Sequence, residues 1–466
     1  MFSYNAKHLA TTSTLPAILT WVMTDLNESH LKPHHNESQR YVFAHVVLGN
    51  FQFYEAEDWS SDMQFAQQMG IDAFAINIGR DLTNERNLPL IYEVAEKNSF
   101  HVFVSFDMVY YGKSGSSDDI IKIIEKFALE KSQFVYQGKP LISTFSGEVP
   151  GTFLVSLKIT SSGELSCYSW SSLKKRLHFP IYFLSVKFLP CWTGIDPTQV
   201  PSVDGMLSWD AWCPVSMSQD QRYIENLSAV GKQYAAPLSA MFYKHLSASQ
   251  NGNYLYPTKS WFLVEKYLNL ISLKPDFIEL LSWNDYGESH YLKDPRPSAN
   301  LPMETISSAT YVDQMPHEPL LDLISHFNKW YKSGTCPPIK RSKAYVWYRP
   351  HPKEMVFDSD LLPIPDGATA VEDKIYITIL VSSTTMLQYI KIESGNRLYH
   401  ANLEAHGTCK QQDVIILISI PFQVGSKQEF KFYDQNKNLL GCLVGCEIMY
   451  KSDIYNFNYW SGLIEL

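Results

Sequence analysis

The chain first becomes regular at YVFAHVVL, residues 41–48, and this stretch sets the pattern that decides the fold. It is short and almost wholly apolar, which is typical of a strand buried on both faces of a parallel sheet. A helical pattern follows, in which Trp59, Met63 and Ala66 share one face and Gly70 stands where a C-terminal cap would be. A second apolar run begins soon afterwards, at residues 73–78, so the order is strand, helix, strand.

The same alternation continues to residue 335. Further strands are predicted at residues 101–108, 140–145, 181–186, 205–209, 238–243 and 277–283. Helical patterns lie among them at residues 88–99, 120–127, 223–230, 261–273 and 320–331. Eight apolar strands separated by helices favour a closed barrel over an open doubly wound sheet. Because no GxGxxG or Walker-type loop follows a strand, nucleotide binding is disfavoured. We therefore predict a (β/α)8 TIM barrel over residues 41–335.

The pattern changes after Gly334. A series of prolines between residues 337 and 365 predicts a linker at residues 336–365. Beyond it, β-rich runs at residues 375–381, 413–418 and 430–433 recur without a helical period, which predicts a C-terminal antiparallel β-sandwich over residues 366–466. Before the barrel, residues 1–40 form a polar lead-in that is poorly defined.

The composition fits a globular protein and is compatible with a neutral polymer as partner. Hydrophobic residues make up 45% of the 466 residues, and the aromatic share of 14% reflects either a large core rich in Phe and Tyr or stacking against sugar rings. The formal net charge is -9 and no long basic run occurs, so neither nucleic acid nor an anionic membrane is an expected partner. No apolar stretch reaches the length of about 18 residues that a membrane span needs.

The cysteines and the N-terminus bear on the compartment. The 7 cysteines are scattered and odd in number, which argues against a disulfide framework. Lys7 precedes a Thr/Ser-rich stretch and only a short apolar piece at residues 16–23, so no secretory signal is predicted and a cytoplasmic protein is expected. No HxH or HExxH spacing occurs, and Cys442 and Cys446 stand apart from other ligands, so we predict neither a metal nor a cofactor.

In a (β/α)8 barrel, the active site lies at the C-terminal ends of the strands. This rule selects candidate substrate contacts, namely His45, Asn77, Trp209, Asp210, Trp212 and Tyr243. His45 is either a core histidine or a hydrogen-bond donor to substrate, and each tryptophan is either a core residue or part of a stacking subsite. Asp107 is either a turn residue or a carboxylate that binds a hydroxyl or raises a neighbour's pKa.

The end of the eighth predicted strand is the richest, with WNDYGESHY at residues 283–291. Gly287 between Asp285 and Glu288 is expected to allow a turn that brings both carboxyls to one cleft. Glycoside cleavage needs one acid to protonate the leaving oxygen and one carboxylate to activate water or to attack directly. The neighbours expected to hold a sugar are Trp283, Tyr286, His290 and Tyr291. The alternative is a helix-entry cap, where acidic residues are also favoured.

These segments resemble glycoside hydrolase family 71, the fungal endo-1,3-α-glucanases or mutanases, over residues 41 to 466. The similar segments of the barrel are AHVVLGN (44–50), GIDAFAINIG (70–79), SFDM (105–108), STFSG (143–147), SWDAW (208–212) and SWNDYGESHY (282–291). Downstream, WYKSG (330–334), WYRPHP (347–352) and YNFNYWSG (455–462) are also similar.

The resemblance implies a barrel with a C-terminal β-sandwich, hydrolysis of α-1,3-glucan and inversion at the anomeric carbon. Asp285 and Glu288 match the catalytic positions, and Asp107 matches a third acidic position. Inversion requires the two carboxyls to lie about 6.5–9.5 Å apart. Glu288 as acid and Asp285 as base is the first assignment, with the reverse left open.

Two alternatives remain at this level: a non-catalytic α-glucan-binding wall protein, and a glycosidase for another linkage. Many members of the family are secreted, whereas no signal is predicted here. The expectation is therefore an intracellular form that meets cell-wall or spore-sac glucan after release.

Overall fold

The computed structural model has two parts, a curled parallel sheet surrounded by helices and a pair of antiparallel sheets. The residues it describes are 17–22, 39–111, 117–146, 158–159, 165–166, 170–187, 204–212, 216–247, 252–258, 261–297, 299, 308–403, 413–425 and 427–466. Within these residues, no helix combines the length and the apolar character needed to cross a bilayer.

Eight parallel strands form the first part. In spatial order they are β2 (Tyr41–Val47), β3 (Ala73–Ile78), β4 (His101–Asp107), β6 (Lys139–Phe145), β9 (Tyr182–Lys187), β10 (Gly205–Ser208), β11 (Gln233–Leu238) and β14 (Phe277–Leu280). Each pairs in parallel with the next, and β14 pairs with β2, so the series of pairings returns to its start. A two-residue strand, β5 (Val135–Tyr136), lies antiparallel to β6.

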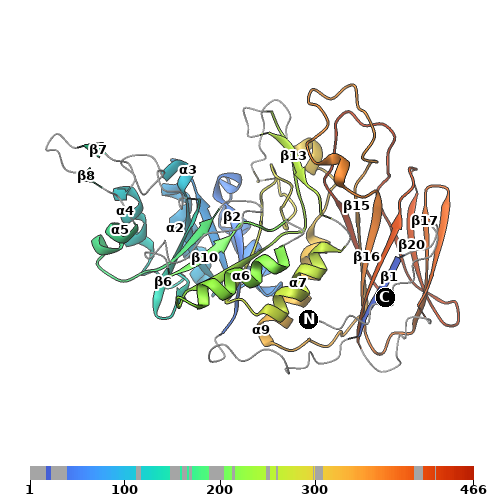
Figure 1. The fold of residues 1–466 in the computed structure, drawn as a ribbon, viewed down its shortest axis with the longest axis horizontal. Helices are drawn as coiled ribbons and strands as arrows, with labels where there is room; N and C mark the ends of the chain where they lie inside the picture. Colours follow the sequence, from blue (N-terminus) through green and yellow to red (C-terminus); the bar gives the residue numbers. More distant parts are fainter. Residues whose placement is uncertain are drawn as a thin grey trace.

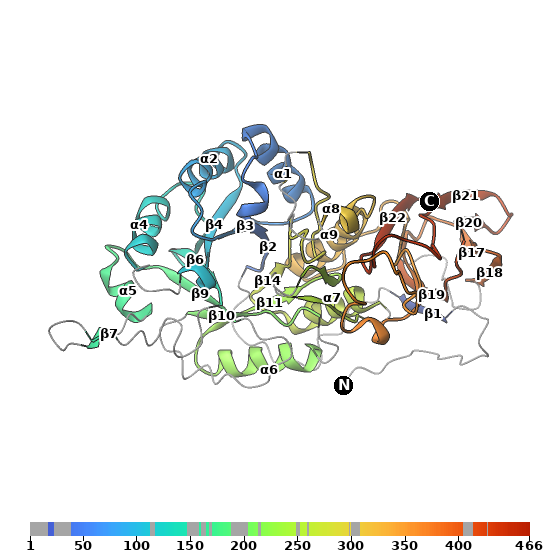
Figure 2. The same ribbon diagram turned by 90° about the horizontal axis from the view of Figure 1, so that it is seen from above.

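Helices lie around the outside of this sheet (Figure 2). The longer ones are α1 (Ala56–Gln68), α2 (Asn84–Lys97), α4 (Ser117–Phe127), α5 (Trp170–Arg176), α6 (Ser216–Ser228), α7 (Phe262–Leu273) and α9 (Glu318–Ser333). Short turns of helix occur at η1 (Leu48–Phe51), α3 (Met108–Tyr111), α8 (Ala309–Val312) and η4 (Ala368–Ala370). Gly70 follows α1 with φ 80°, as expected of a C-terminal cap. The β9–β10 connection, residues 188–203, lies outside the described residues.

Alternate residues of each parallel strand face the inside of the curled sheet. Phe43 on β2 and Phe103 on β4 lie on strands that are not neighbours, yet their ring centroids are 5.0 Å apart. Only side chains on the concave face can meet in this way. Val42, Ala44 and their equivalents pack outward against the helices in a separate core cluster. His45, two residues beyond Phe43, therefore also points inward.

One predicted strand is misplaced. The seventh strand of the curled sheet is β11 at 233–238, whereas the predicted run 238–243 begins only at its last residue. Phe242–His245 is instead β12, which forms an antiparallel hairpin with β13 (Asn253–Tyr256) beyond the sheet. The strand sequence QYAAPL is less apolar than the run that follows it, so hydrophobicity alone favoured the wrong segment.

The second part consists of two antiparallel sheets that share a hydrophobic core. One has the order β1-β19-β16-β15-β22 and the other β18-β17-β20-β21. Their bounds are β15 (Lys343–Tyr348), β16 (Lys374–Val381), β17 (Leu387–Ser394), β18 (Arg397–Asn402), β19 (Val414–Pro421), β20 (Gln428–Asp434), β21 (Leu439–Val444) and β22 (Trp460–Glu465). Ile377 and Ile416 of the first sheet belong to the same buried cluster as Ile390 and Phe430 of the second.

The edges of this second part differ from the predicted boundaries. β15 falls within the predicted linker, yet it is an inner strand between β16 and β22. β1 (Ala17–Val22) falls within the polar lead-in and pairs antiparallel with β19, so a blue strand lies beside the orange ones (Figure 1). A small hairpin of β7 (Lys158–Ile159) and β8 (Leu165–Ser166) projects from the far end of the parallel part.

Candidate active site

The two predicted acids lie in the loop that follows β14. The backbone N–H of Asp285 donates to Ser282 Oγ at 2.7 Å, and the N–H of Glu288 donates to Asp285 Oδ1 at 3.1 Å. The loop leaves 22% of the Asp285 side chain and 26% of the Glu288 side chain exposed, so both can reach a ligand. The residue with a left-handed backbone is Ser289, at φ 53°, and not Gly287. Hydrogen bonds, rather than a glycine turn, therefore bring the two acids together.

Glu288 is held as a carboxylate by two basic side chains. Lys244 Nζ donates to Oε1 at 2.8 Å, and His290 Nε2 donates to Oε2 at 3.1 Å. Burial alone would raise the pKa of Glu288, but the hydrogen bond from His290 and the positive charge of Lys244 lower it to about 2. Glu288 is thus ionised at any ordinary working pH.

Asp285 is in the opposite situation. Its Oδ2 lies 3.5 Å from His290 Nε2, a weaker contact than the one Glu288 makes. Burial raises the pKa of Asp285 above its ordinary value, and the negative charge of Glu288 raises it further. The two carboxyls are neighbours, and their pKa values are shifted in opposite directions. Such a pair is suited to supply one proton donor and one proton acceptor.

Lys244 is not among the predicted site residues, because the run 238–243 was expected to be a strand of the parallel sheet, whereas Lys244 lies on β12 of the hairpin. In β12, alternate side chains face opposite sides. Lys244 and Phe242 face the loop, where Phe242 lies 5.7 Å from the His290 ring at an interplanar angle of 20°. Tyr243, a predicted substrate contact, points the other way and donates its hydroxyl to the Tyr455 carbonyl. The period-2 pattern of the strand would have found Lys244, had its register been known.

A second carboxylate–histidine pair lies inside the curled sheet. His45 Nδ1 is 2.8 Å from Glu279 Oε1, and both side chains are almost wholly buried. The ring of Trp209 meets that of His45 edge to face, with centroids 5.1 Å apart. Glu279 was missed because it lies within an apolar run of β14, where a buried carboxylate is unexpected.

Asp107 lies at the end of β4 on the same concave face. Burial raises the pKa of Asp107 to about 6, while the N–H of Val109, donating at 2.9 Å, and the charge of His45 act in the opposite direction. A carboxyl with such a pKa can exchange protons near neutrality. No described contact joins Asp107 directly to the Asp285–Glu288 pair.

Several buried polar atoms on the concave face have no hydrogen-bond partner among the described residues. They are Asn77 Nδ2, Ser105 Oγ, Ser143 Oγ and Glu279 Oε2. Each residue lies at an inward position of its strand. An unsatisfied buried polar atom costs free energy, so a group of them at one level marks a place suited to ligand hydroxyls.

The remaining candidates near β10 differ in their surroundings. Trp209 packs inside the sheet against Phe145 and His45. Trp212 lies beside the acids, 5.3 Å from the His290 ring, and its Nε1 donates to the Met241 carbonyl at 2.8 Å. Asp210 is buried, and its carbonyl accepts from Lys266 Nζ at 3.0 Å.

The aromatic residues of the loop that follows β14 pack into the protein. Trp283 Nε1 donates to Asp62 Oδ2 at 2.9 Å, beneath α1. Tyr291 stacks on His317 with centroids 4.0 Å apart, and Tyr286 is fully buried beside Phe51. The three side chains are therefore buried by packing contacts, and the sugar contact expected from the sequence stays a prediction.

Asp285, Glu288 and His290 also satisfy a geometric condition for holding a metal ion, since one ligand atom of each lies within 4.8 Å of the others. The electrostatics favour a different interpretation. Lys244 already supplies a positive charge to Glu288, and the neighbouring carboxylates raise the pKa of His290, so the ring is set to carry a proton. A further cation would be repelled by both.

Comparison with known proteins identifies relatives over nearly the whole chain. A mutanase of Penicillium rubens is 30% identical, covering 96% of this chain and 94% of its own length. The glucan endo-1,3-alpha-glucosidase agn1 of Schizosaccharomyces pombe is 31% identical, covering 92% and 95%. An ascus wall endo-1,3-alpha-glucanase of the same yeast is 27% identical, covering 74% and 80%.

A solved GH99 endo-alpha-mannosidase of Bacteroides thetaiotaomicron aligns with a TM-score of 0.46 at 11% identity, covering 63% of this chain and 97% of that one. That likeness is too low to support an argument. The sequence profile of glycosyl hydrolase family 71 matches residues 38–465, which include the Asp285–Glu288 loop and both parts of the fold. The chain is therefore a glycoside hydrolase and belongs to glycosyl hydrolase family 71.

Proposed function

We propose that this chain cleaves α-1,3-glucosidic bonds within the α-glucan of fungal cell walls, with Asp285 and Glu288 as the reacting carboxyls. The substrate class follows from the relatives, a mutanase and endo-1,3-alpha-glucanases. The observation that carries the mechanism is the pair of opposite pKa shifts in one loop, upward for Asp285 and downward for Glu288. We take the curled sheet to be a (β/α)8 barrel and the antiparallel sheets to be a β-sandwich.

The electrostatics support the reverse of the first assignment of roles. Asp285 is the general acid, since the raised pKa keeps its proton available for the glycosidic oxygen as the C–O bond breaks. Glu288 is the base that removes a proton from the water attacking the anomeric carbon. The proton lost by Asp285 leaves on the glucan hydroxyl, and Glu288 takes one proton from the attacking water, so the total charge of the pair does not change. The starting state is restored when the proton on Glu288 passes back to Asp285, directly or through solvent, as the products leave.

The stereochemical course is the finer part of the proposal. Family resemblance supports inversion, which calls for carboxyls about 6.5–9.5 Å apart. An oxygen of Asp285 and one of Glu288 lie within 4.8 Å of each other. Inversion therefore requires a wider separation in the complex with glucan. Proton NMR of the first product distinguishes inversion from retention, because inversion yields the β-anomer and retention yields the α-anomer.

Activity assays on α-1,3-glucan and β-1,3-glucan test the function. Asp285→Asn and Glu288→Gln are each expected to lower the rate on α-1,3-glucan by about a thousandfold or more. Glu265→Gln, on the outer helix α7, is the matched control and is expected to retain activity. Equal rates in all variants would end the catalytic assignment.

Two outcomes would select the alternatives. Release of reducing ends from the β-linked polymer alone would assign a different linkage. Binding of insoluble α-1,3-glucan without any release of reducing ends would identify a non-catalytic α-glucan-binding protein.

A further inference from the structure

The hairpin of β12 and β13 connects the loop that carries Asp285 and Glu288, here named the catalytic loop, to the C-terminal part of the chain. On its front face, Lys244 contacts Glu288, and the N–H of Tyr243 donates to the Glu288 carbonyl at 3.1 Å. On its rear face, Tyr243 and His245 contact residues beyond the barrel. The hairpin thus contacts both the side chain and the backbone of Glu288, and its opposite face packs against the C-terminal part of the chain.

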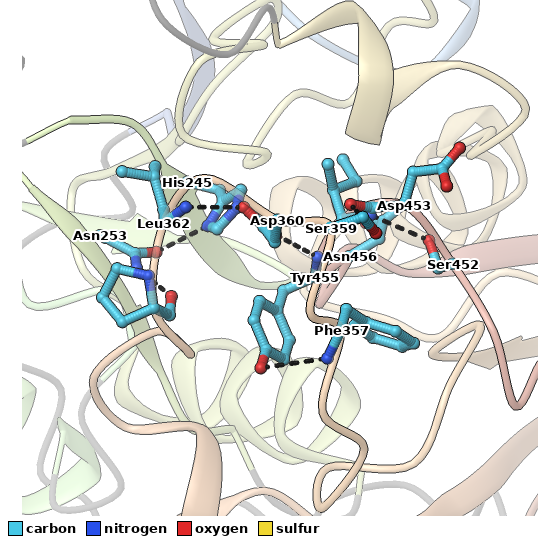
Figure 3. Close-up of polar contacts among 12 residues, drawn as sticks. His245, Asn253, Phe357, Ser359, Asp360, Leu362, Ser452, Asp453, Tyr455 and Asn456 are labelled. Carbon is cyan, nitrogen blue, oxygen red and sulfur yellow. Dashed lines mark hydrogen bonds and ion pairs between the residues drawn. The ribbon is translucent and has the colours of Figure 1, made fainter.

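Asp360 joins three segments behind this hairpin (Figure 3). Its carboxylate lies 2.9 Å from His245 Nε2 on β12. It also accepts the N–H of Leu362 at 2.9 Å and the N–H of Tyr455 at 2.6 Å. The side chains of His245 and Asp360 are both 0% exposed. A buried carboxylate with this many donors is a fixed point, because moving it would leave a charge unpaired.

The other ring nitrogen of His245 is also fixed. Asn253 on β13 donates its Nδ2 to the Pro363 carbonyl at 2.6 Å, which turns its Oδ1 toward His245 Nδ1 at 2.7 Å. Both ring nitrogens therefore face acceptors, one on each side. The imidazole therefore contacts Asn253 and Asp360 at once, and it ties the two strands of the hairpin to the segment that carries Asp360.

The C-terminal segment Tyr455–Tyr459 reaches the catalytic loop by a second route. The Tyr455 carbonyl accepts the hydroxyl of Tyr243. Asn458 Nδ2 donates to the Tyr311 carbonyl at 2.9 Å, and the Tyr311 hydroxyl donates to the Gly287 carbonyl at 2.8 Å. Gly287 is next to Glu288, so this chain of bonds also ends at the catalytic pair.

We infer that Asp360 and the segment Tyr455–Tyr459 position the catalytic carboxyls, because together they hold the β12–β13 hairpin so that Lys244 stays on Glu288. The inference rests on the proposed role of Glu288. It gives the C-terminal part of the chain a function in catalysis that does not depend on sugar binding. Asp360 and His245 are positioning residues, since neither touches the acids.

The expected consequence is electrostatic. The groups that face Glu288 are Lys244 from β12, Tyr254 and Tyr256 from β13, Tyr311 from α8, and Asp285 and His290 from its own loop. Of these, only Lys244 is held by the hairpin and carries a positive charge. If the hairpin loosens, the charge of Lys244 moves away and the pKa of Glu288 rises toward its ordinary value.

The first test compares Asp360→Asn with Asp322→Asn in the full chain. Asp322 is a matched control, because it also bridges the two parts, accepting from Lys343 Nζ at 2.9 Å and from the Tyr345 hydroxyl at 2.7 Å, but it does not touch the hairpin. Hydrogen–deuterium exchange is measured on peptides covering residues 240–247 and 283–291. Faster exchange there in Asp360→Asn alone is expected, and equal exchange in the two variants overturns the inference. This readout does not depend on activity.

The second test is the ratio of kcat/KM on α-1,3-glucan at about pH 4 to that at about pH 6. If the pKa of Glu288 returns from about 2 to 4.5, this ratio falls about fourfold in Asp360→Asn, while Asp322→Asn keeps the wild-type ratio. A uniform loss of rate with an unchanged ratio overturns the positioning role. Loss of all activity in the wild type would instead refute the proposed function and leave the exchange result valid.

A milder pair of variants covers the case in which Asp360→Asn does not fold. Tyr243→Phe removes only the hydroxyl that Tyr455 accepts, and Tyr345→Phe removes an equally buried hydroxyl at the same interface. Faster exchange around residue 288 and a lower pH ratio are expected for Tyr243→Phe only. Identical behaviour of the two phenylalanine variants contradicts the inference.

Discussion

The inside of the curled sheet has a lower layer and an upper layer that differ in chemistry although they lie on the same strands. The lower layer is aromatic, with Phe43, Phe103 and Phe277 in contact. Two residues further along, β2 and β14 present His45 and Glu279, and four residues beyond Phe103, β4 presents Asp107; these three side chains form the upper layer. The lower layer has the apolar packing that stabilises the curled sheet, and the upper layer holds polar groups whose burial destabilises it. Stability and chemistry are therefore separated along the strand by one or two repeats of the pleat.

Substitution in the lower layer should cause the largest loss of stability. Phe103→Ala leaves a cavity where Phe43 and Phe134 meet, so the free energy of unfolding is expected to fall by about 3–5 kcal/mol. Urea unfolding measures this loss. Activity per folded molecule should remain close to that of the wild type. A large loss of kcat in the folded fraction would break the separation between the layers.

Asp107→Asn should raise the free energy of unfolding, whereas Phe103→Ala lowers it. The folded-state pKa of about 6 lies above the ordinary 3.8, so ionising Asp107 costs folding free energy as the pH rises through this range. At pH 7, the asparagine variant is expected to be more stable by up to about 3 kcal/mol, and below about pH 4 the difference should vanish. Activity should fall by about tenfold or more. Thermal unfolding at both pH values is the measurement, and a variant less stable at pH 7 would contradict the argument.

Glu279→Gln tests whether a buried charge in the upper layer serves activity rather than stability. The amide keeps the shape of the side chain but removes the charge beside His45, so kcat/KM is expected to fall about tenfold with Tm changed by only about 3 °C. Glu265→Gln is again the matched control. A fall in Tm without a loss of kcat/KM would make Glu279 a structural residue.

The smallest effect concerns the unpartnered hydroxyls. Ser105→Ala and Ser143→Ala remove buried Oγ atoms without a described partner, so stability should stay level or rise by up to about 1 kcal/mol while KM for glucan increases. Ser132→Ala is the contrasting control, because its Oγ donates to the Tyr92 carbonyl at 2.8 Å and its loss should cost about 1 kcal/mol. An unchanged KM in both test variants would remove these hydroxyls from the site.

The sequence predicted the parts of this comparison that follow from regular periodicity. The runs at 73–78 and 101–108 nearly coincide with β3 and β4, and their ends supplied Asn77 and Asp107. Glu279 and Lys244 were not predicted as site residues, and the reasons are physical. A carboxylate inside an apolar run contradicts the usual burial preference, and Lys244 required the register of a hairpin formed by residues that pair only in three dimensions.

Composition also failed to separate the two kinds of residue in the loop of Asp285 and Glu288. Trp283, Tyr286 and Tyr291 alternate along the chain with Asp285, Glu288 and His290, so a sequence shows one dense cluster. The structure turns the aromatic rings into the core and leaves the acids on the open side. Side-chain direction in an irregular loop depends on packing partners such as Asp62 and His317, which lie far away in the sequence.

The pairing of β1 with β19 has a practical consequence for dissecting the protein. One C-terminal sheet is split in sequence, because its strand β1 precedes the whole curled parallel sheet and its other strands follow that sheet. Removing the first 40 residues would leave VIILISI, residues 414–420, as an unprotected apolar edge, which is a template for association with other chains. An N-terminal truncation or a separately expressed C-terminal fragment should therefore lose solubility before it loses any catalytic group.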